Sequence, residues 1–170
     1  IIDDRANGGG NVSPMILERL SREPYRLTMR RGSARIGTVP DAVQVGPKVC
    51  LINKYSASDG DLFPWGFRAL GLGKLIGTRT WGGIVGISGS LPYMDGTDIR
   101  VPFFTSFDPK TGSWIIENHG VDPDILIDND PVKEWNGEDQ QLDRAIQEVM
   151  KELQDRKPLP GVPTPRDFSK

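Results

Sequence analysis

"KVCLINKYSASDGDLFPWGF", residues 48–67, is the stretch of sequence that decides the fold. The apolar run at residues 48–54 has the length and composition of a strand that is buried on both faces. Further along, the apolar residues Phe63, Phe67 and Leu70 recur at i, i+4 and i+7, which predicts a helix over residues 59–70. A buried strand therefore gives way to a helix at a serine, Ser58.

The flanking segments extend this pattern. "IIDDR" predicts another buried strand, and the glycine bend "ANGGGN" leads into a short helix that Ser13 caps, with Pro14 at its first position. We expect strands in "YRLTMRR" and "KLIGTRT", a loop over residues 34–47, and short strands in "GIVGI", "DIRVPFF", "SWIIEN" and "DILID". Two strand–helix units in series followed by a strand-rich half predict an α/β fold with a partly parallel sheet.

The clearest helix is expected at the C-terminal end of this fold, over residues 138–155. Its apolar residues form one stripe that must pack on something apolar: Leu142, Ile146, Val149, Met150 and Leu153. The sequence therefore predicts one domain at residues 1–156 and a proline-rich arm at residues 157–170.

Composition narrows the classes of function. A net charge of −2 gives no attraction to nucleic acid or to an anionic membrane, and no apolar stretch reaches the about 18 residues of a membrane span. The chain has one histidine and one cysteine, Cys50, which lies in an apolar run, so we expect a buried thiol, no metal site and no cofactor. These features favour a cytoplasmic protein. Because the first residues begin inside a strand, we expect the chain to be part of a longer one.

Ser58 lies where an α/β fold places its chemistry, between the end of a strand and the start of a helix. A serine nucleophile needs a base within hydrogen-bond reach, and its tetrahedral intermediate needs fixed N–H donors. The first N–H groups of a helix are unpaired, which makes the Asp59 N–H a candidate donor. The glycine bend is a second candidate, because glycine lets the backbone approach a ligand closely. The alternative is an ordinary polar turn at Ser58.

The segments "IIDDRANGGGNVS", "SASD" and "LIGTRTWGG", in that order, resemble the tail-specific or C-terminal-processing serine peptidases. The resemblance covers most of residues 1–128. It implies the α/β spiral fold that this family shares with the Clp protease and crotonase families. It also implies that Ser58 is the nucleophile and that the N–H groups of Gly9, with Gly10 as its neighbour, and of Asp59 form the oxyanion hole.

One position separates two branches of that family. In the branch with a serine–lysine dyad, the motif resembles "GxRTFGKG", and its general-base lysine falls on Gly83 of "GTRTWGGI". Glycine cannot accept a proton, and Lys74, which lies outside the motif, is interpreted as a surface charge.

The longer segment "YSASDGDLFPWGFR" resembles the branch typified by tricorn protease. There a histidine and a second serine come from a segment well before the nucleophile, and a glutamate, matched by Glu117 in "WIIENHGVDPDI", completes the set. The resemblance implies a serine peptidase that acts on oligopeptides, with its base histidine upstream of Ile1. It further implies a homo-oligomer, a hexamer in that relative, and an essentially inactive chain when residues 1–170 stand alone.

Other interpretations stay open. Glu117 can be an exposed strand-end carboxylate, and His119 can complete an intrachain triad with Ser58 and Glu117 or lie in a surface turn. The whole chain can also be a non-catalytic peptide-binding or assembly module that kept the fold. In that case its strand-rich half would bind extended peptide by edge addition.

Overall fold

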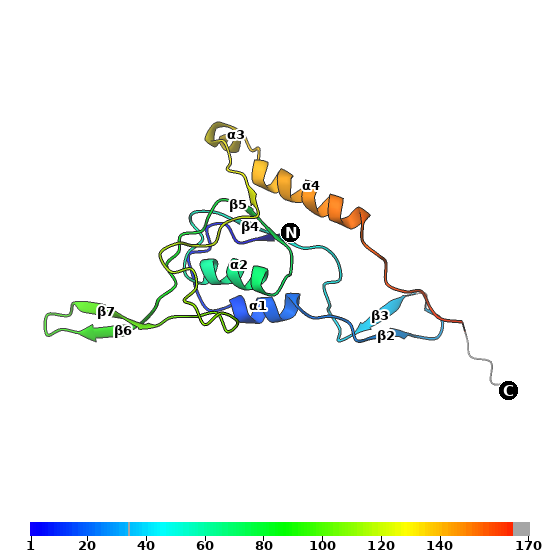
Figure 1. Cartoon of the computed structure of the whole chain (residues 1–170), viewed down its shortest axis with the longest axis horizontal. Helices are drawn as coiled ribbons and strands as arrows, with labels where there is room; N and C mark the ends of the chain where they lie inside the picture. Colours follow the sequence, from blue (N-terminus) through cyan, green and yellow to red (C-terminus); the bar gives the residue numbers. More distant parts are fainter. Residues whose placement is uncertain (34, 165–170) are drawn as a thin grey trace.

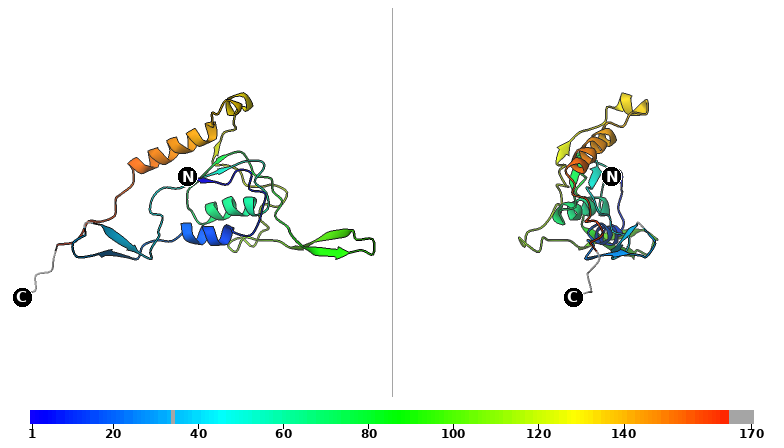
Figure 2. Two further views of the ribbon diagram at one scale, coloured as in Figure 1. Left: turned by 180° about the vertical axis from the view of Figure 1, so that it is seen from behind. Right: turned by 90° about the vertical axis from the view of Figure 1, so that its right-hand side faces the viewer.

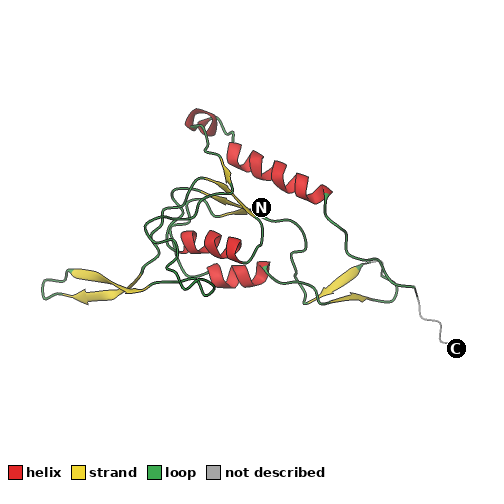
Figure 3. Ribbon diagram, in the orientation of Figure 1, coloured by secondary structure: helices red, strands yellow, loops and turns green. Residues whose placement is uncertain are grey.

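The computed structural model describes residues 1–33 and 35–164 and shows an α/β chain (Figures 1 and 3). The helices are α1 (Ser13–Leu20), α2 (Asp59–Ala69), α3 (Pro131–Trp135) and α4 (Gln140–Gln154). The strands are β1 (Ile2–Asp3), β2 (Arg26–Met29), β3 (Ile36–Val39), β4 (Val49–Ile52), β5 (Lys74–Gly77), β6 (Gly86–Pro92), β7 (Asp98–Phe104) and β8 (Ile125–Leu126). The predicted α/β class is confirmed, while the spiral arrangement stays a prediction.

A parallel sheet in the order β1-β4-β5-β8 forms the centre of the molecule. All four residues of β4 are fully buried, as the apolar run predicts. Because side chains alternate along a strand, Cys50 and Ile52 join the core under α1 and α2, whereas Val49 and Leu51 pack on the side of α4. Helices therefore cover both faces of the sheet. The chain leaves the C-terminal end of β4 and turns directly into α2.

Two antiparallel hairpins, β2–β3 and β6–β7, project from opposite ends of this body (Figures 1 and 2). The β6–β7 hairpin exposes large apolar side chains, among them Ile87, Ile99, Val101, Phe103 and Phe104. Of the predicted arm, residues 157–164 contain no helix or strand, and Pro160–Pro163 line a pocket together with residues of the β2–β3 hairpin. Residues 165–170 of that arm lie outside the described residues.

Several local expectations are wrong, among them the strand at "GIVGI", of which only Gly86 and Ile87 belong to a strand, β6. Residues 36–39 form β3, which pairs with β2, where we expected a loop; residue 34 of that loop is not described. Ser13 is the first residue of α1 and not its cap, because the cap bonds come from Asp59 of α2. "SWIIEN" forms turns, since the carbonyls of Ile115 and Ile116 accept nearby N–H groups.

Helix α4 confirms the expected C-terminal helix but packs through another face. Gln141, Ala145 and Glu148 are buried, whereas four of the five stripe residues, Leu142, Ile146, Met150 and Leu153, are exposed, and only Val149 packs against the core. Polar contacts also fasten the helix: Arg5 Nη2 lies 2.8 Å from Asp139 Oδ2, and Lys74 pairs with Glu148. Among the described residues, no helix has the length and apolar character to cross a membrane.

Candidate active site

Ser58 lies in the turn between β4 and α2, directly before the first residue of the helix, and is half-buried. Its backbone adopts φ 58° and ψ −112°, outside the regions that a residue with a Cβ normally occupies. Such strain persists only where surrounding contacts hold it, and it is concentrated at functional sites. A strained strand-to-helix turn is also how α/β-hydrolases present a nucleophilic serine.

The glycine bend lies against the Ser58 side chain. A Cβ built on Gly9 would be 3.0 Å from Ser58 Cβ and 3.3 Å from Ser58 Oγ, and Gly9 has φ 124°. Only glycine tolerates both the backbone angle and the contact. The structure therefore brings together the hydroxyl and the bend that the sequence predicts to face each other.

The two predicted oxyanion donors differ in their present partners. Asp59 N–H, at the first position of α2, donates to no acceptor within residues 1–33 and 35–164. Gly9 N–H donates to Asn7 Oδ1 at 3.1 Å. One donor is therefore open and the other is shared with a neighbouring side chain.

The Asp59 carboxylate binds the start of α1. It is buried and accepts hydrogen bonds from Val12 N–H at 3.1 Å, Ser13 N–H at 3.0 Å and Ser13 Oγ at 2.5 Å. These bonds satisfy the otherwise unpaired N–H groups at the start of α1. The side chain therefore fixes α1, and with it the end of the glycine bend, to the turn that carries Ser58.

Asp61 supports the turn that carries Ser58 from inside the protein. This fully buried carboxylate accepts N–H bonds from Ser58 at 2.9 Å, Gly82 at 2.8 Å and Gly83 at 3.2 Å. Sequence reasoning missed this residue. The available signal is the spacing S-x-x-D at residues 58–61, which is typical of a capping box.

Glu117 binds the next two N–H groups of the loop whose residues 82 and 83 bond to Asp61. Its Oε2 accepts the N–H groups of Ile84 at 2.7 Å and Val85 at 3.0 Å. Four consecutive N–H groups, those of residues 82–85, thus bond to two carboxylates, Asp61 and Glu117. The second oxygen, Oε1, makes no hydrogen bond to any part of the chain that the structure describes, so it is open to a further donor.

His119 points elsewhere. Its side chain is 56% exposed; Nδ1 is 2.9 Å from the carbonyl oxygen of Gly120, and Nε2 is 3.7 Å from Asp122 Oδ2. In the described chain it bonds neither to Ser58 nor to Glu117, which favours the surface-turn interpretation. Lys74 likewise faces Glu148 and Glu152 of α4 rather than Ser58.

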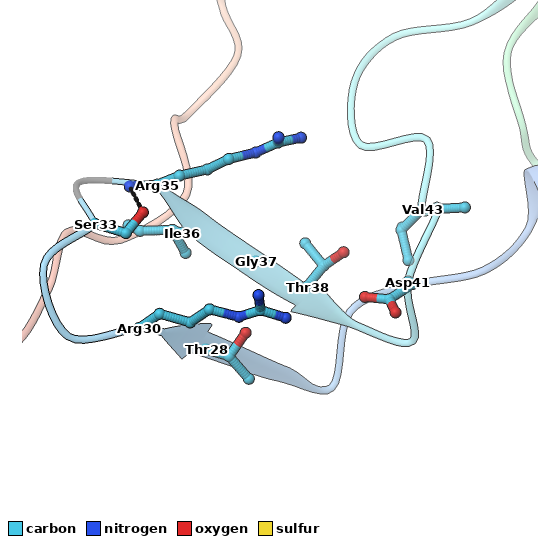
Figure 4. A pocket seen from close by; sticks show the side chains of 10 residues that line it. Thr28, Arg30, Ser33, Arg35, Ile36, Gly37, Thr38, Asp41 and Val43 are labelled. Atoms are coloured by element: carbon cyan, nitrogen blue, oxygen red, sulfur yellow. Dashed lines mark hydrogen bonds between the residues drawn. The ribbon is translucent and has the colours of Figure 1, made fainter.

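A polar pocket of about 560 Å³ lies elsewhere, on the projecting β2–β3 hairpin (Figure 4). Its lining includes Thr28, Arg30, Arg35, Thr38 and Asp41. Figure 4 shows Arg30 extending over the hairpin beside Thr28. None of the predicted site residues lines this pocket, so it is separate from the site around Ser58.

Comparison with known proteins agrees with this geometry. The model of peptidase family S41 matches residues 1–127. A tricorn protease of Thermoplasma volcanium is 43% identical over 157 residues, which are 91% of this chain and 15% of that protein. A putative tricorn-like protease C-terminal subunit of Sulfurisphaera tokodaii is 39% identical over 156 residues, 92% of this chain and 18% of that protein.

The solved structures give the same result. The crystal structure of the tricorn protease superposes with a TM-score of 0.81 at 41% identity, and covers 89% of this chain and 15% of that one. The chain thus spans less than a fifth of the length of these relatives. Sequence, fold and the order of the site segments agree, and the chain belongs to peptidase family S41, with the fold of a tricorn-type C-terminal core.

Proposed function

We propose that this chain carries the nucleophile of a serine peptidase that hydrolyses oligopeptides through an acyl-enzyme on Ser58. The observation that carries the proposal is the contact between the Ser58 hydroxyl and the glycine bend, at a strained turn beside the open Asp59 N–H. As the peptide carbonyl is attacked, the N–H groups of Asp59 and Gly9 stabilise the oxyanion. Each such donor typically contributes about 10² to 10³ in rate.

The base in this proposal is a histidine from sequence upstream of Ile1. Two observations support that source: His119 faces Gly120 and Asp122, and Lys74 is engaged by α4. Glu117 accepts the N–H of the incoming imidazole on Oε1, while the loop holds Oε2, and so orients the ring and favours its charged form. The large part of the relatives' length that this chain does not span leaves room for such a segment.

We further propose a cytoplasmic homo-oligomer, a hexamer by resemblance, in which the exposed apolar residues of α4 and of the β6–β7 hairpin are covered by other parts of the assembly. Contiguous apolar side chains on the surface of a soluble fold usually mark a site that another protein surface covers.

Cys50, fully buried, with its thiol pKa raised by that burial, fits a reducing compartment. No cofactor takes part.

A fluorophosphonate probe on the longer natural protein tests the proposal. We expect one label, on Ser58 by peptide mapping, lost in Ser58→Ala and retained in His119→Ala. Residues 1–170 alone should react slower by about 10⁴ to 10⁶, because oxyanion donors without a base give only residual catalysis. A folded protein with no label on Ser58 would instead support a peptide-binding module.

A further inference from the structure

Asn7 joins the two segments that meet at Ser58. Its backbone carbonyl accepts Ala57 N–H at 2.8 Å, next to the nucleophile, and its side-chain Oδ1 accepts Gly9 N–H at 3.1 Å. Its side-chain Nδ2 donates to Asp4 Oδ1 at 2.9 Å. One residue therefore contacts the nucleophile turn, the glycine bend and a buried carboxyl group.

The close approach at this point leaves little freedom. A Cβ built on Gly60, in the first turn of α2, would lie 2.2 Å from the Asn7 carbonyl oxygen. The backbone of Asn7 thus touches the helix that follows Ser58. Small movements of Asn7 must shift either the nucleophile turn or the bend, because interiors packed this closely transmit displacement.

Asp4 decides which way the Asn7 carboxamide faces. The two ends of a carboxamide have opposite hydrogen-bonding character, so an acceptor at Nδ2 leaves Oδ1 for the Gly9 N–H. Asp4 itself is fixed: Ser56 Oγ donates to its carbonyl oxygen at 2.8 Å, and its N–H donates to Leu51 of β4 at 2.9 Å. The orientation is therefore anchored in the sheet.

The buried Asp4 carboxyl group lowers the stability of the fold. The residue is only 6% exposed, and Oδ2 has no hydrogen-bond partner within the described residues. Burial raises its pKa to about 7, with added repulsion from Asp59 and Asp61 of α2 and from Asp3 of β1. A buried polar group with an unsatisfied atom is destabilising, and its presence therefore calls for an explanation, of which a role at a site is one.

We propose that Asn7 and Asp4 are positioning residues of the oxyanion site: Asp4 orients the Asn7 carboxamide, and Asn7 places the Gly9 N–H beside Ser58. This inference rests on the proposed function and deepens it. The Gly9 bond to Asn7 is of ordinary length between neutral groups, whereas a bond to an oxyanion is charge-assisted and stronger. The N–H is thus held in place at rest and shared with the oxyanion during reaction.

Three variants of the longer natural protein test the pair: Asn7→Ala, Asn7→Asp, and the exchange Asp4→Asn with Asn7→Asp. Asn11→Ala is the matched control, because Asn11 is an exposed asparagine of the same bend whose side chain makes no hydrogen bond in the described chain. The readouts are the rate of fluorophosphonate labelling at Ser58, kcat and KM on an oligopeptide, and hydrogen–deuterium exchange of the Gly9 amide.

We expect Asn7→Ala to lower both the labelling rate and kcat about 10- to 100-fold, with KM changed by less than about threefold. The reason is that the variant misplaces an oxyanion donor and removes no contact that binds the substrate. Gly9 exchange should quicken at the same time. Asn7→Asp alone places two carboxyl groups together and should be as slow. The exchanged pair restores both a donor toward residue 7 and an acceptor for Gly9, so Gly9 exchange should return to the wild-type rate. Labelling should stay slow, because the new carboxylate competes with the oxyanion for the Gly9 N–H.

Each outcome decides something. If the wild-type protein labels and Asn7→Ala labels as fast as Asn11→Ala with unchanged Gly9 exchange, the positioning role is wrong and the proposed function stands. If the wild-type protein does not label, the proposed function fails, and Gly9 exchange still tests the pair. In that case faster exchange in Asn7→Ala, reversed in the exchanged pair, supports the positioning role, and equal exchange refutes it.

Discussion

Asp61→Asn is the most informative single change at the turn that carries Ser58. The Asp61 carboxylate accepts three N–H groups, with Oδ2 shared by Ser58 and Gly83 and Oδ1 bonded to Gly82. Asparagine has one acceptor oxygen. In its better orientation it keeps the two bonds of Oδ2, without their charge, and turns an NH₂ group toward the Gly82 N–H.

The magnitude follows from that count. A lost hydrogen bond to a charged group costs about 1.5–3 kcal/mol, and the opposed buried donors add to it, so we expect about 2–4 kcal/mol lower stability. Ser58 would also lose part of the contact that holds its strained backbone, and a displacement of about 1 Å can lower a rate about 100-fold. Labelling of Ser58 should therefore slow by about two orders of magnitude.

Urea unfolding and fluorophosphonate labelling measure the two effects in the same preparations. Asp143→Asn is the control, since Asp143 is an exposed carboxylate on α4 with no side-chain hydrogen bond in the described chain. Equal urea midpoints and equal labelling rates for the two variants would show that Asp61 does not support the nucleophile turn.

Three further changes test other parts of the site. Gly9→Ala should abolish labelling of Ser58 while the protein stays folded, because the added Cβ meets the Ser58 side chain at a φ of 124°; a labelled variant contradicts the contact. Glu117→Gln should lower kcat about 10²- to 10⁴-fold with stability changed by less than about 1 kcal/mol, since one amide oxygen still accepts the loop N–H groups; unchanged kcat would exclude a role in orienting the base. The folded-state pKa of Asp4 is about 7, above its ordinary value of 3.8, so the folded protein retains a proton that the unfolded chain releases, and stability should fall as pH rises from about 4 to 7. Asp4→Asn should remove this pH dependence, so that in urea titrations the variant does not lose the about 2–4 kcal/mol of unfolding free energy that the wild-type protein loses between pH 4 and pH 8. An unaltered pH dependence would show that other groups cause it.

The parts of the fold that depend on local pattern could be predicted from the sequence. The run 48–54 and the helical period after Ser58 predicted β4 and α2, and β4 then fixed the centre of the sheet. Segments whose structure depends on distant partners could not. "SWIIEN" has the composition of a strand, but its turns bring Glu117 to the N–H groups of residues 84 and 85.

The same division applies to the site. Ser58, the glycine bend and Asp59 are candidates because strands end and helices begin there, whereas the choice of Ser58 as nucleophile and of Gly9 within the bend comes from the resemblance. The structure brings these residues together. For Asp61 the only local signal is the S-x-x-D spacing at residues 58–61, and for Asn7 the contact with the Gly9 N–H leaves no mark on the residue types around it. The use of the Asp59 side chain as a cap for α1 is likewise a tertiary effect.

The row of N–H groups at residues 82–85 has a consequence for the effect of dissolved ions. Asp61 and Glu117 are compensated there by peptide dipoles, and within the described residues neither forms an ion pair with lysine or arginine that added salt could weaken. The link between Arg5 and Asp139, which fastens the start of α4 to the segment that follows β1, is an ion pair. Concentrated electrolyte should therefore loosen the outer helix well before it disturbs the geometry around the serine.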